Sequence, residues 1–482
     1  MDLAMRKQNS IFGIAFGDKT RKILGIIFKV FGVLLGLSYL WLTLSDAYIE
    51  RSIYTLEEMI PNLSGRLIIE FIQFFTNASV LVAITAPFFF FRSTDKIVRY
   101  FNPVIIILRL LLSSNLIEVT IGPSGGNRYF LTEQFYVEIA LLAVISIFAW
   151  VMFLFEGRPR STKKDILRTS ALALLVYVLI GICNIPFSFP TGVFGPANAR
   201  ALDFSFAHRL IIYSTVTVPF VFMMLFRNKT YHIRWYLCLQ LALATFFFYF
   251  RRATFESLID PARLPLHLCN TATVIMLIAF TFKCKPAFYF AYLINILGAY
   301  FAVFMPDKMG DILYSDSLHY WHNHLADIMI PMLAVGLKVF DRPKLKYVLY
   351  ALIGFSVYFV IVAYLDAKYY YKGVDYFFLN SDKFTSYAVG LNFIRTDFVI
   401  TIPIKGGCGT LRILWLYWIG VYLSYVALTF AMWFVFSLVY RISDSHIDCH
   451  NKIAAKKKLI KERKAFLAAQ KQEEQKWSKF HI

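Results

Sequence analysis

Residues 346–366 read KYVLYALIGFSVYFVIVAYLD, an apolar stretch with one charged residue at each end and none between them. An α-helix of about 20 residues crosses the roughly 30 Å hydrocarbon core of a bilayer. The stretch is too long and too continuously apolar for a strand of a transmembrane barrel, in which apolar and polar residues alternate. It therefore predicts a transmembrane helix.

Eleven more stretches have the same character, and the composition supports the same interpretation. Hydrophobic residues make up 58% of the chain and charged residues 17%, whereas charged residues reach about 25% in soluble domains. The predicted fold is an all-α, polytopic bundle of about 12 transmembrane helices. We place them near residues 23–45, 67–91, 101–120, 134–155, 166–189, 206–226, 233–250, 265–282, 287–305, 320–340, 346–366 and 412–440.

Lys and Arg residues lie mostly beside the predicted spans. In a soluble protein, the net charge of +20 would suggest a nucleic-acid partner. Here about two thirds of the 50 Lys and Arg residues fall on the side of the spans that holds both termini. Because cytoplasmic loops carry the excess of positive charge, the sequence predicts a cell-membrane protein with cytoplasmic N- and C-termini. The predicted partners are membrane lipids and not nucleic acid, and no oligomeric state follows from the sequence.

A run rich in Pro and Gly, PFSFPTGVFGP at residues 186–196, is the best candidate for a domain boundary. Pro and Gly at this density cannot continue a helix. The predicted regions are residues 1–197, with five spans, residues 198–440, with seven spans, and residues 441–482, a basic cytoplasmic tail that is expected to be helical.

One constellation carries obvious chemistry. Cys269 belongs to the string RLPLHLCN at residues 263–270, and the string HYWHNH follows at residues 319–324. Pro265 suits the first position of a helix, where a missing N–H costs nothing. This start would place Cys269 about 6 Å along the helix axis. A predicted hairpin between the two strings brings them to the same outer edge of the membrane.

These residues can form a nucleophile, a base and an orienting group. His324 and Asp327 are three residues apart and share a helical face, so the carboxylate could hold an imidazole in one tautomer while an imidazole takes the proton of Cys269. The helix N-terminus and Arg263 would both favour the thiolate. The candidate substrate-binding residues lie at the same outer edge, at or near the ends of the predicted spans. They are His208, Arg209, Arg263, His267 and His322.

Other interpretations remain open at this point. His267, Cys269 and the histidines at 319–324 could bind a metal, but their spacing matches no known zinc pattern, so no metal and no cofactor are predicted. These side chains could also lie at the interface with no catalytic role. A disulfide between Cys269 and Cys408 is possible in an oxidising exterior.

Two further functions compete with catalysis. Twelve helices with both termini inside suit a secondary transporter, and Arg109, near mid-depth in its span, would then mark a substrate path. As a structural ion pair, Arg109 would need an interior partner, for which Glu70, Glu118 and Glu138 are the candidates. The other possibility is a structural membrane protein with no catalytic function.

The segment from about residue 206 to 440 resembles the YwaF-like integral membrane proteins of bacteria. The matching features are His208 at the mouth of the first helix, the basic turn at 227–234, the string LPLHLCN at 264–270, and His324 followed by Pro331. The family has eukaryotic relatives believed to be cysteine-dependent phospholipid acyltransferases. The resemblance therefore implies that Cys269 is an acyl-accepting nucleophile and that His324 is its base. The leading hypothesis is a polytopic membrane enzyme that transfers or hydrolyses acyl chains on lipids near the outer leaflet.

A fainter resemblance concerns the second span. Its string FFTNAS at residues 74–79 is similar to the Phe-Thr pattern of the androgen-induced membrane hydrolases, whose nucleophile is a Thr paired with a His. The fourth and fifth spans contain no His. The resemblance therefore implies that the N-terminal region is a degenerate, non-catalytic copy.

Overall fold

The computed structural model describes residues 10, 12–44, 63–89, 92–111, 128–156, 205–250, 255–306, 315–381, 394, 397–403 and 410–478. Within this part of the chain, seven helices are long and apolar enough to cross a membrane: Asp18–Leu44, Glu133–Phe155, Phe206–Phe226, Tyr231–Phe250, Lys285–Phe304, Leu345–Lys372 and Trp415–Ile442. Two shorter apolar helices are Phe75–Thr85 and Leu268–Phe282. The predicted all-α helical bundle is confirmed. The predicted span at 166–189 and the Pro- and Gly-rich run lie outside the described residues.

The helices form an N-terminal and a C-terminal group. The N-terminal group contains α2 (Asp18–Leu44), α4 (Leu63–Thr85), α5 (Arg92–Lys96), η1 (Ile97–Phe101), α6 (Asn102–Leu111) and α8 (Arg128–Glu156). The C-terminal group contains α11 (Phe206–Phe226), α12 (Tyr231–Phe250), α13 (Phe255–Ile259), α14 (Leu268–Phe282), α15 (Lys285–Phe290), η3 (Ala291–Asn295), α16 (Ile296–Phe304), α17 (Ser315–Gly336), α18 (Leu345–Tyr369), η4 (Tyr370–Lys372), η5 (Tyr376–Phe378) and α20 (Trp415–Ser478).

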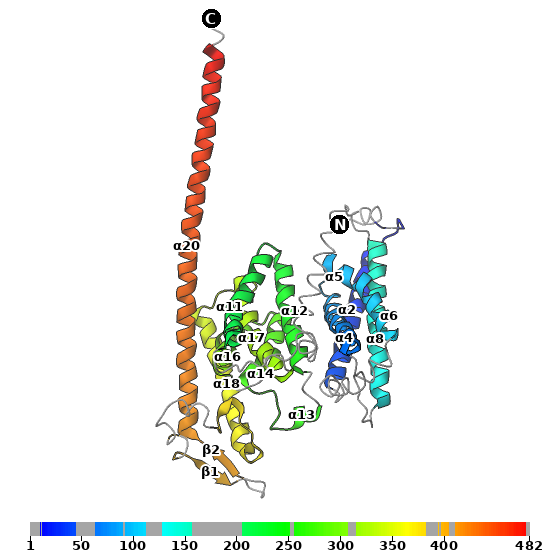
Figure 1. Ribbon diagram of the computed structural model, residues 1–482, viewed down its shortest axis with the longest axis vertical. Helices are drawn as coiled ribbons and strands as arrows, with labels where there is room; N and C mark the ends of the chain where they lie inside the picture. Colours follow the sequence, from blue (N-terminus) through cyan, green and yellow to red (C-terminus); the bar gives the residue numbers. More distant parts are fainter. Residues whose placement is uncertain are drawn as a thin grey trace.

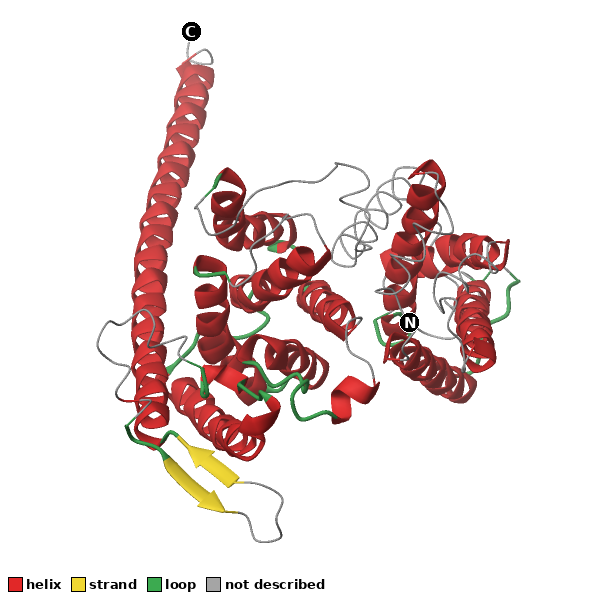
Figure 2. Ribbon diagram, turned by 60° about the horizontal axis from the view of Figure 1, so that its bottom comes forward, coloured by secondary structure: helices red, strands yellow, loops and turns green. Residues whose placement is uncertain are grey.

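The two groups pack against each other through α12. The hydroxyls of Thr85 on α4 and Tyr236 on α12 lie 3.2 Å apart, and the rings of Tyr39 on α2 and Phe247 on α12 are 4.7 Å apart. The long helix α20 lies on the opposite side of the C-terminal group from α2 and α8 (Figures 1 and 2). A membrane bundle without a hydrophobic driving force between helices relies on such polar and aromatic contacts.

A short hairpin departs from the helical architecture of the described residues. Strands β1 (Ile400–Pro403) and β2 (Thr410–Ile413) pair antiparallel, with Ile400 opposite Ile413. The hairpin lies at the end of the bundle where α20 begins, and α20 runs from there past the other end (Figure 1).

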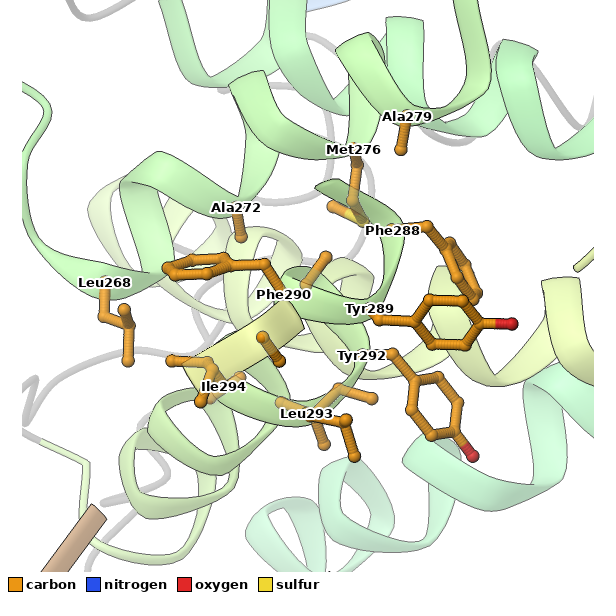
Figure 3. Packing of buried hydrophobic residues seen from close by; sticks show 14 of the residues in the cluster. Leu268, Ala272, Met276, Ala279, Phe288, Tyr289, Phe290, Tyr292, Leu293 and Ile294 are labelled. Carbon is orange, nitrogen blue, oxygen red and sulfur yellow. The ribbon is translucent and has the colours of Figure 1, made fainter. Parts of the chain in front are cut away.

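The core of the C-terminal group is centred on α14 and the continuous helix formed by α15, η3 and α16. Leu268, Ala272 and Met276 of α14 face the buried side chains of α15 and η3 (Figure 3). A Cβ added to Gly298 would lie 3.1 Å from a methyl carbon of Leu268. The glycine therefore allows α16 to lie close to the first turn of α14, which carries Cys269.

Three predicted details of the helices were wrong. Helix α14 begins at Leu268 and not at Pro265, because residue 267 is extended (φ −60°, ψ 145°) and caps the helix. Helix α17 ends at Gly336, so Lys338, which was placed within a span, is exposed in a left-handed conformation (φ 56°). The third span starts at Arg92 and not near residue 101, and Arg99 within it is buried and paired with Asp95 at 2.6 Å.

The basic tail continues the last span as one helix, α20, without a break. The expected helical tail is therefore confirmed as far as Ser478. Since helical rise is 1.5 Å per residue, the part of α20 beyond Ile442 extends roughly 50 Å past the apolar span.

Two sets of elements in the chain have the same order. The sets α4, α5–η1–α6, α8 and α14, α15–η3–α16, α17 each contain a helix, then a helix interrupted by a π-helical turn, then a third helix. Two buried asparagines, Asn77 and Asn102, are 25 residues apart in the first set. Asn270 and Asn295 have the same 25-residue spacing in the second.

Candidate functional site

Cys269 is the second residue of α14. His267 caps the helix in an extended conformation, and its carbonyl oxygen accepts hydrogen bonds from the N–H groups of Asn270 (2.9 Å) and Thr271 (3.0 Å). The positive end of the helix dipole therefore lies beside the sulfur of Cys269. Helix N-termini are among the positions at which reactive cysteines occur in proteins.

Three side chains from three different elements hold the loop that leads into Cys269. The Tyr358 hydroxyl of α18 donates to the Leu266 carbonyl at 2.6 Å. The amide of Asn295, at the end of η3, donates to the Leu268 carbonyl, and the Tyr376 hydroxyl of η5 donates to the Pro261 carbonyl. Because the loop backbone is tied on both sides of residue 266, the position of the thiol is fixed by the surrounding bundle.

A polar contact connects this turn to α17. The Cys269 thiol donates to the side-chain oxygen of Asn270 at 3.5 Å, and the Asn323 amide donates to the same oxygen at 3.2 Å. Asn323 is the neighbour of His324, so the turn of α17 that carries the candidate base contacts the turn of α14 that carries the thiol.

His324 is buried, and its Nδ1 lies 2.7 Å from the carbonyl oxygen of Tyr320. A carbonyl only accepts hydrogen bonds, so Nδ1 carries the proton in the neutral ring and Nε2 carries the lone pair. The Tyr320 carbonyl thus holds the imidazole in one tautomer, the contribution that was predicted for Asp327. Asp327 is fully buried, and neither of its carboxyl oxygens has a hydrogen-bond partner among the described residues.

The candidate substrate-binding residues lie around this turn in different settings. His208 is buried, and its Nε2 lies 2.7 Å from the Val303 carbonyl at the end of α16. Arg209 is exposed on the first turn of α11. Arg263 is 72% exposed and lies 3.6 Å from Asp260. The structure thus brings His208 into the bundle and leaves the two guanidinium groups at its surface.

The remaining histidines contact different parts of the bundle. The His322 ring lies 4.3 Å from the Phe248 ring, and the Nε2 of His319 lies 3.3 Å from the Tyr249 carbonyl, both on α12. The His267 ring contacts Tyr376 and Phe378 at 5.5 and 5.7 Å. Among the described residues, no group of three or more His, Cys, Asp or Glu side chains is placed to hold a metal ion. Cys408 lies outside them.

The segment Tyr376–Phe378, which we call the aromatic cap, lies beside the loop that leads into Cys269. Phe377 and Phe378 both have positive φ (56° and 55°), a conformation that costs about 1–3 kcal/mol for a non-glycine residue. Partial burial raises the pKa of Tyr376 to about 12, so its hydroxyl keeps its proton and donates to the Pro261 carbonyl throughout the physiological range. The Phe378 carbonyl accepts from the Tyr417 hydroxyl at 3.0 Å, which fixes the cap to α20.

Sequence reasoning did not identify four polar residues of this site: Asn270, Asn295, Asn323 and Tyr358. Each lies in or beside an otherwise apolar helix. A buried amide in lipid requires a hydrogen-bond partner, so the position of these amides in apolar stretches was a usable signal for Asn270 and Asn295. Tyr358 carried no such signal, because tyrosines are abundant in this chain.

Replacing Tyr358 with Phe is expected to loosen the loop without removing any reacting group. A single hydrogen bond contributes about 0.5–1.5 kcal/mol, so alkylation of Cys269 by a maleimide should change by roughly 2- to 10-fold. Peptide mass spectrometry can measure that rate. Tyr364→Phe on the lipid-facing side of the same helix is the matched control, and an equal change in both variants would contradict the role given to Tyr358.

Comparison with known proteins gives one match. Residues 203–436 match the sequence model of the TMEM164 family, a membrane-protein family. No curated protein and no solved structure matches the chain. The C-terminal part of this membrane protein, which contains Cys269, His324, Asp327 and the aromatic cap, is thus similar to the TMEM164 family.

Proposed function

We propose that the protein is a membrane-embedded lipid acyltransferase or acyl hydrolase that uses Cys269 as nucleophile and His324 as base. The observation that carries the proposal is the contact between the turns of these two residues through Asn270 and Asn323. The match to the TMEM164 family and the resemblance to YwaF-like proteins, whose relatives include cysteine-dependent acyltransferases, support it.

The reaction needs two half-steps. In the first, the Cys269 sulfur attacks the ester carbonyl of a phospholipid, a C–S bond forms, the ester C–O bond breaks, and the protonated His324 gives its proton to the departing oxygen. In the second, an acceptor hydroxyl gives its proton to His324 and attacks the thioester, which releases the thiolate. With a lipid alcohol as acceptor the result is acyl transfer, and with water it is hydrolysis.

The depth of the thiol suits an acyl ester. Cys269 lies 13 residues, about 20 Å, from the Phe282 end of α14. In a hydrocarbon core of about 30 Å this distance places the sulfur in the outer third of the membrane if the Lys283–Lys285 turn is cytoplasmic. The basic residues at that turn and along the tail support cytoplasmic termini in the cell membrane and a reaction near the outer leaflet.

An acyl-transfer assay tests the proposal. The full-length protein in vesicles is incubated with a phospholipid that carries a deuterated acyl chain and with a lysophospholipid acceptor, and labelled products are measured by mass spectrometry. Cys269→Ala is expected to abolish transfer and release of the labelled chain. Cys284→Ser, at the cap of α15 just beyond the far end of α14, is the matched control and should retain them. Loss in both variants, or in neither, would argue against Cys269 as nucleophile.

We further propose that the N-terminal group is a related but non-catalytic copy of α14–α17. The shared order of elements, the π-helical turn in each set and the equal spacing of the asparagine pairs support the relation. In this alignment Thr76, before Asn77, stands where Cys269 stands before Asn270. No histidine follows in the described residues of α8.

A hydroxyl without a histidine base is a weak nucleophile. Thr76→Ala is therefore expected to leave the formation of an acyl-enzyme and the transfer rate within about twofold of the unchanged protein, the range of ordinary context effects. The same vesicle assay measures both. A large loss of transfer in Thr76→Ala, with normal protein yield and melting temperature, would mean that the N-terminal group takes part in the chemistry.

A further inference from the structure

The bundle contains a group of buried oxygen atoms that accept hydrogen bonds but have no donor. They are the two carboxyl oxygens of Asp327 and the side-chain oxygens of Asn295 and Asn323, and none of the four has a partner among the described residues. The exposed fractions of Asp327, Asn295 and Asn323 are 0%, 0% and 3%. Buried acceptors in native proteins are nearly always satisfied, so four together indicate that a ligand belongs there.

Helical geometry brings these residues to one depth. The Tyr320 hydroxyl of α17 donates to the Ala302 carbonyl of α16 at 2.7 Å, and the two helices are antiparallel neighbours. Seven residues further along α17 is Asp327, and seven residues back along the other helix is Asn295. Seven residues are two turns, roughly 10 Å, so Asp327 and Asn295 lie at a similar distance from this contact along the two neighbouring helices. Asn323 is one turn above Asp327 on the same face.

The amide groups of the two asparagines are already oriented. The Asn295 nitrogen donates to the Leu268 carbonyl, and the Asn323 nitrogen donates to the Asn270 side chain at 3.2 Å. Both nitrogens are therefore directed toward the first turn of α14, which leaves both amide oxygens as acceptors. The resulting donor-free set consists of one carboxylate and two carbonyl-type oxygens, the ligands that hard cations prefer.

Asp327 differs from the other buried carboxylates of the described residues. Asp95 pairs with Arg99 at 2.6 Å, Glu138 pairs with Arg109, and Asp366 accepts a hydrogen bond from the Tyr376 N–H at 2.9 Å. Asp327 has neither a cation nor a donor in this part of the chain. A bare carboxylate in an apolar interior is costly, and the described residues supply Asp327 with no counter-charge.

We propose that Asp327, Asn295 and Asn323 bind a monovalent cation, with Na⁺ as the ion to test. One such cation neutralises one carboxylate, whereas a divalent ion would leave a net positive charge inside the membrane. A proton alone would give a neutral acid with a single donor, which satisfies only one of the remaining acceptors. Backbone carbonyl oxygens inside membrane bundles coordinate Na⁺ in transporters.

The proposed cation site contacts the turn of α14 that carries Cys269, but cation binding does not require Cys269 to be catalytic. A cation on the amide oxygens polarises both amides and strengthens their donation to the first turn of α14. Opening of that turn then requires release of the ion. By mass action, alkylation of Cys269 through the open turn should slow roughly tenfold when Na⁺ is at ten times its dissociation constant. This expectation holds whether or not the protein transfers acyl chains.

The experiment uses the purified full-length protein in NaCl or choline chloride at equal ionic strength. ²²Na⁺ binding is measured by scintillation proximity, and alkylation of Cys269 is measured by peptide mass spectrometry. We expect saturable binding near one ion per chain, slower alkylation in Na⁺ and a melting temperature several degrees higher. Asp327→Asn should lose all three responses, whereas the control Asp366→Asn, another buried carboxylate, should keep them.

A second variant covers the case in which Asp327→Asn does not fold. Asn323→Ala removes one ligand and keeps the carboxylate, so its response should need a higher Na⁺ concentration. The proposal would be overturned by an unchanged protein that shows no saturable ²²Na⁺ binding, which would leave Asp327 as a protonated acid. It would equally be overturned if folded Asp327→Asn or Asn323→Ala bound Na⁺ as the unchanged protein does.

Discussion

His324→Gln is expected to lower the rate at which Cys269 is acylated by roughly 10²- to 10⁴-fold, the usual contribution of a general base. Glutamine can keep the hydrogen bond to the Tyr320 carbonyl through its amide, but it cannot take a proton at pH 7. Single-turnover acylation by a labelled phospholipid, followed by intact mass spectrometry, measures this rate.

The pH profile separates a lost base from a disturbed fold. Without the imidazole, the rate in His324→Gln should rise steeply toward the range in which free thiols ionise, near about 8.5. His319→Gln is the matched control, because His319 lies on the same helix and contacts α12. Acylation of His324→Gln at the unchanged rate, or an equal loss in His319→Gln, would contradict the assignment of the base.

Arg109→Met is expected to destabilise the protein by about 3–5 kcal/mol, because it leaves Glu138 as an uncompensated buried charge. The two side chains form a buried ion pair between α6 and α8, and the Arg109 guanidinium also lies over the Phe135 ring at 4.5 Å. The predicted need for an interior partner is thus confirmed, with Glu138 as that partner. Thermal unfolding in detergent, with the protein concentration held constant, measures the loss.

The double variant Arg109→Met with Glu138→Leu should regain most of this stability, because replacing a buried ion pair by apolar residues is often neutral or stabilising. The same variant distinguishes enzyme from transporter. In a transporter whose substrate path runs past Arg109, the stable double variant would lose transport. If Arg109 is structural, the double variant should keep the acyl transfer of the unchanged protein, and a complete loss of function would favour transport.

The membrane helices could be predicted from sequence because their physical basis is local. A run of about 20 apolar residues is enough to identify a span. The predicted bounds of α11 agree with the structure at both ends. The start of α14 could not be predicted in this way. Pro265 is compatible with a first helical position, but Tyr358 holds the Leu266 carbonyl from α18, and this contact joins residues 92 positions apart.

The candidate site was predictable in part. A thiol and an imidazole at the ends of two spans could be placed at one edge of the membrane by counting crossings, and the LPLHLCN string at 264–270 strengthened that inference. The orientation of His324 could not be predicted, because it depends on which helix faces which. The structure gives its Nδ1 a backbone partner, Tyr320, that no side-chain motif reveals. Asp327 then becomes available for a different role.

The most direct test of the central claim is intact mass spectrometry of the full-length protein after incubation with phospholipid, beside Cys269→Ser. The account predicts an added mass of one acyl chain on the unchanged protein, removed by hydroxylamine at neutral pH and located at Cys269 by peptide analysis. Cys269→Ser should show no adduct that hydroxylamine removes under these conditions. No adduct on the unchanged protein under conditions that preserve thioesters, or an equal adduct on Cys269→Ser, would contradict the account.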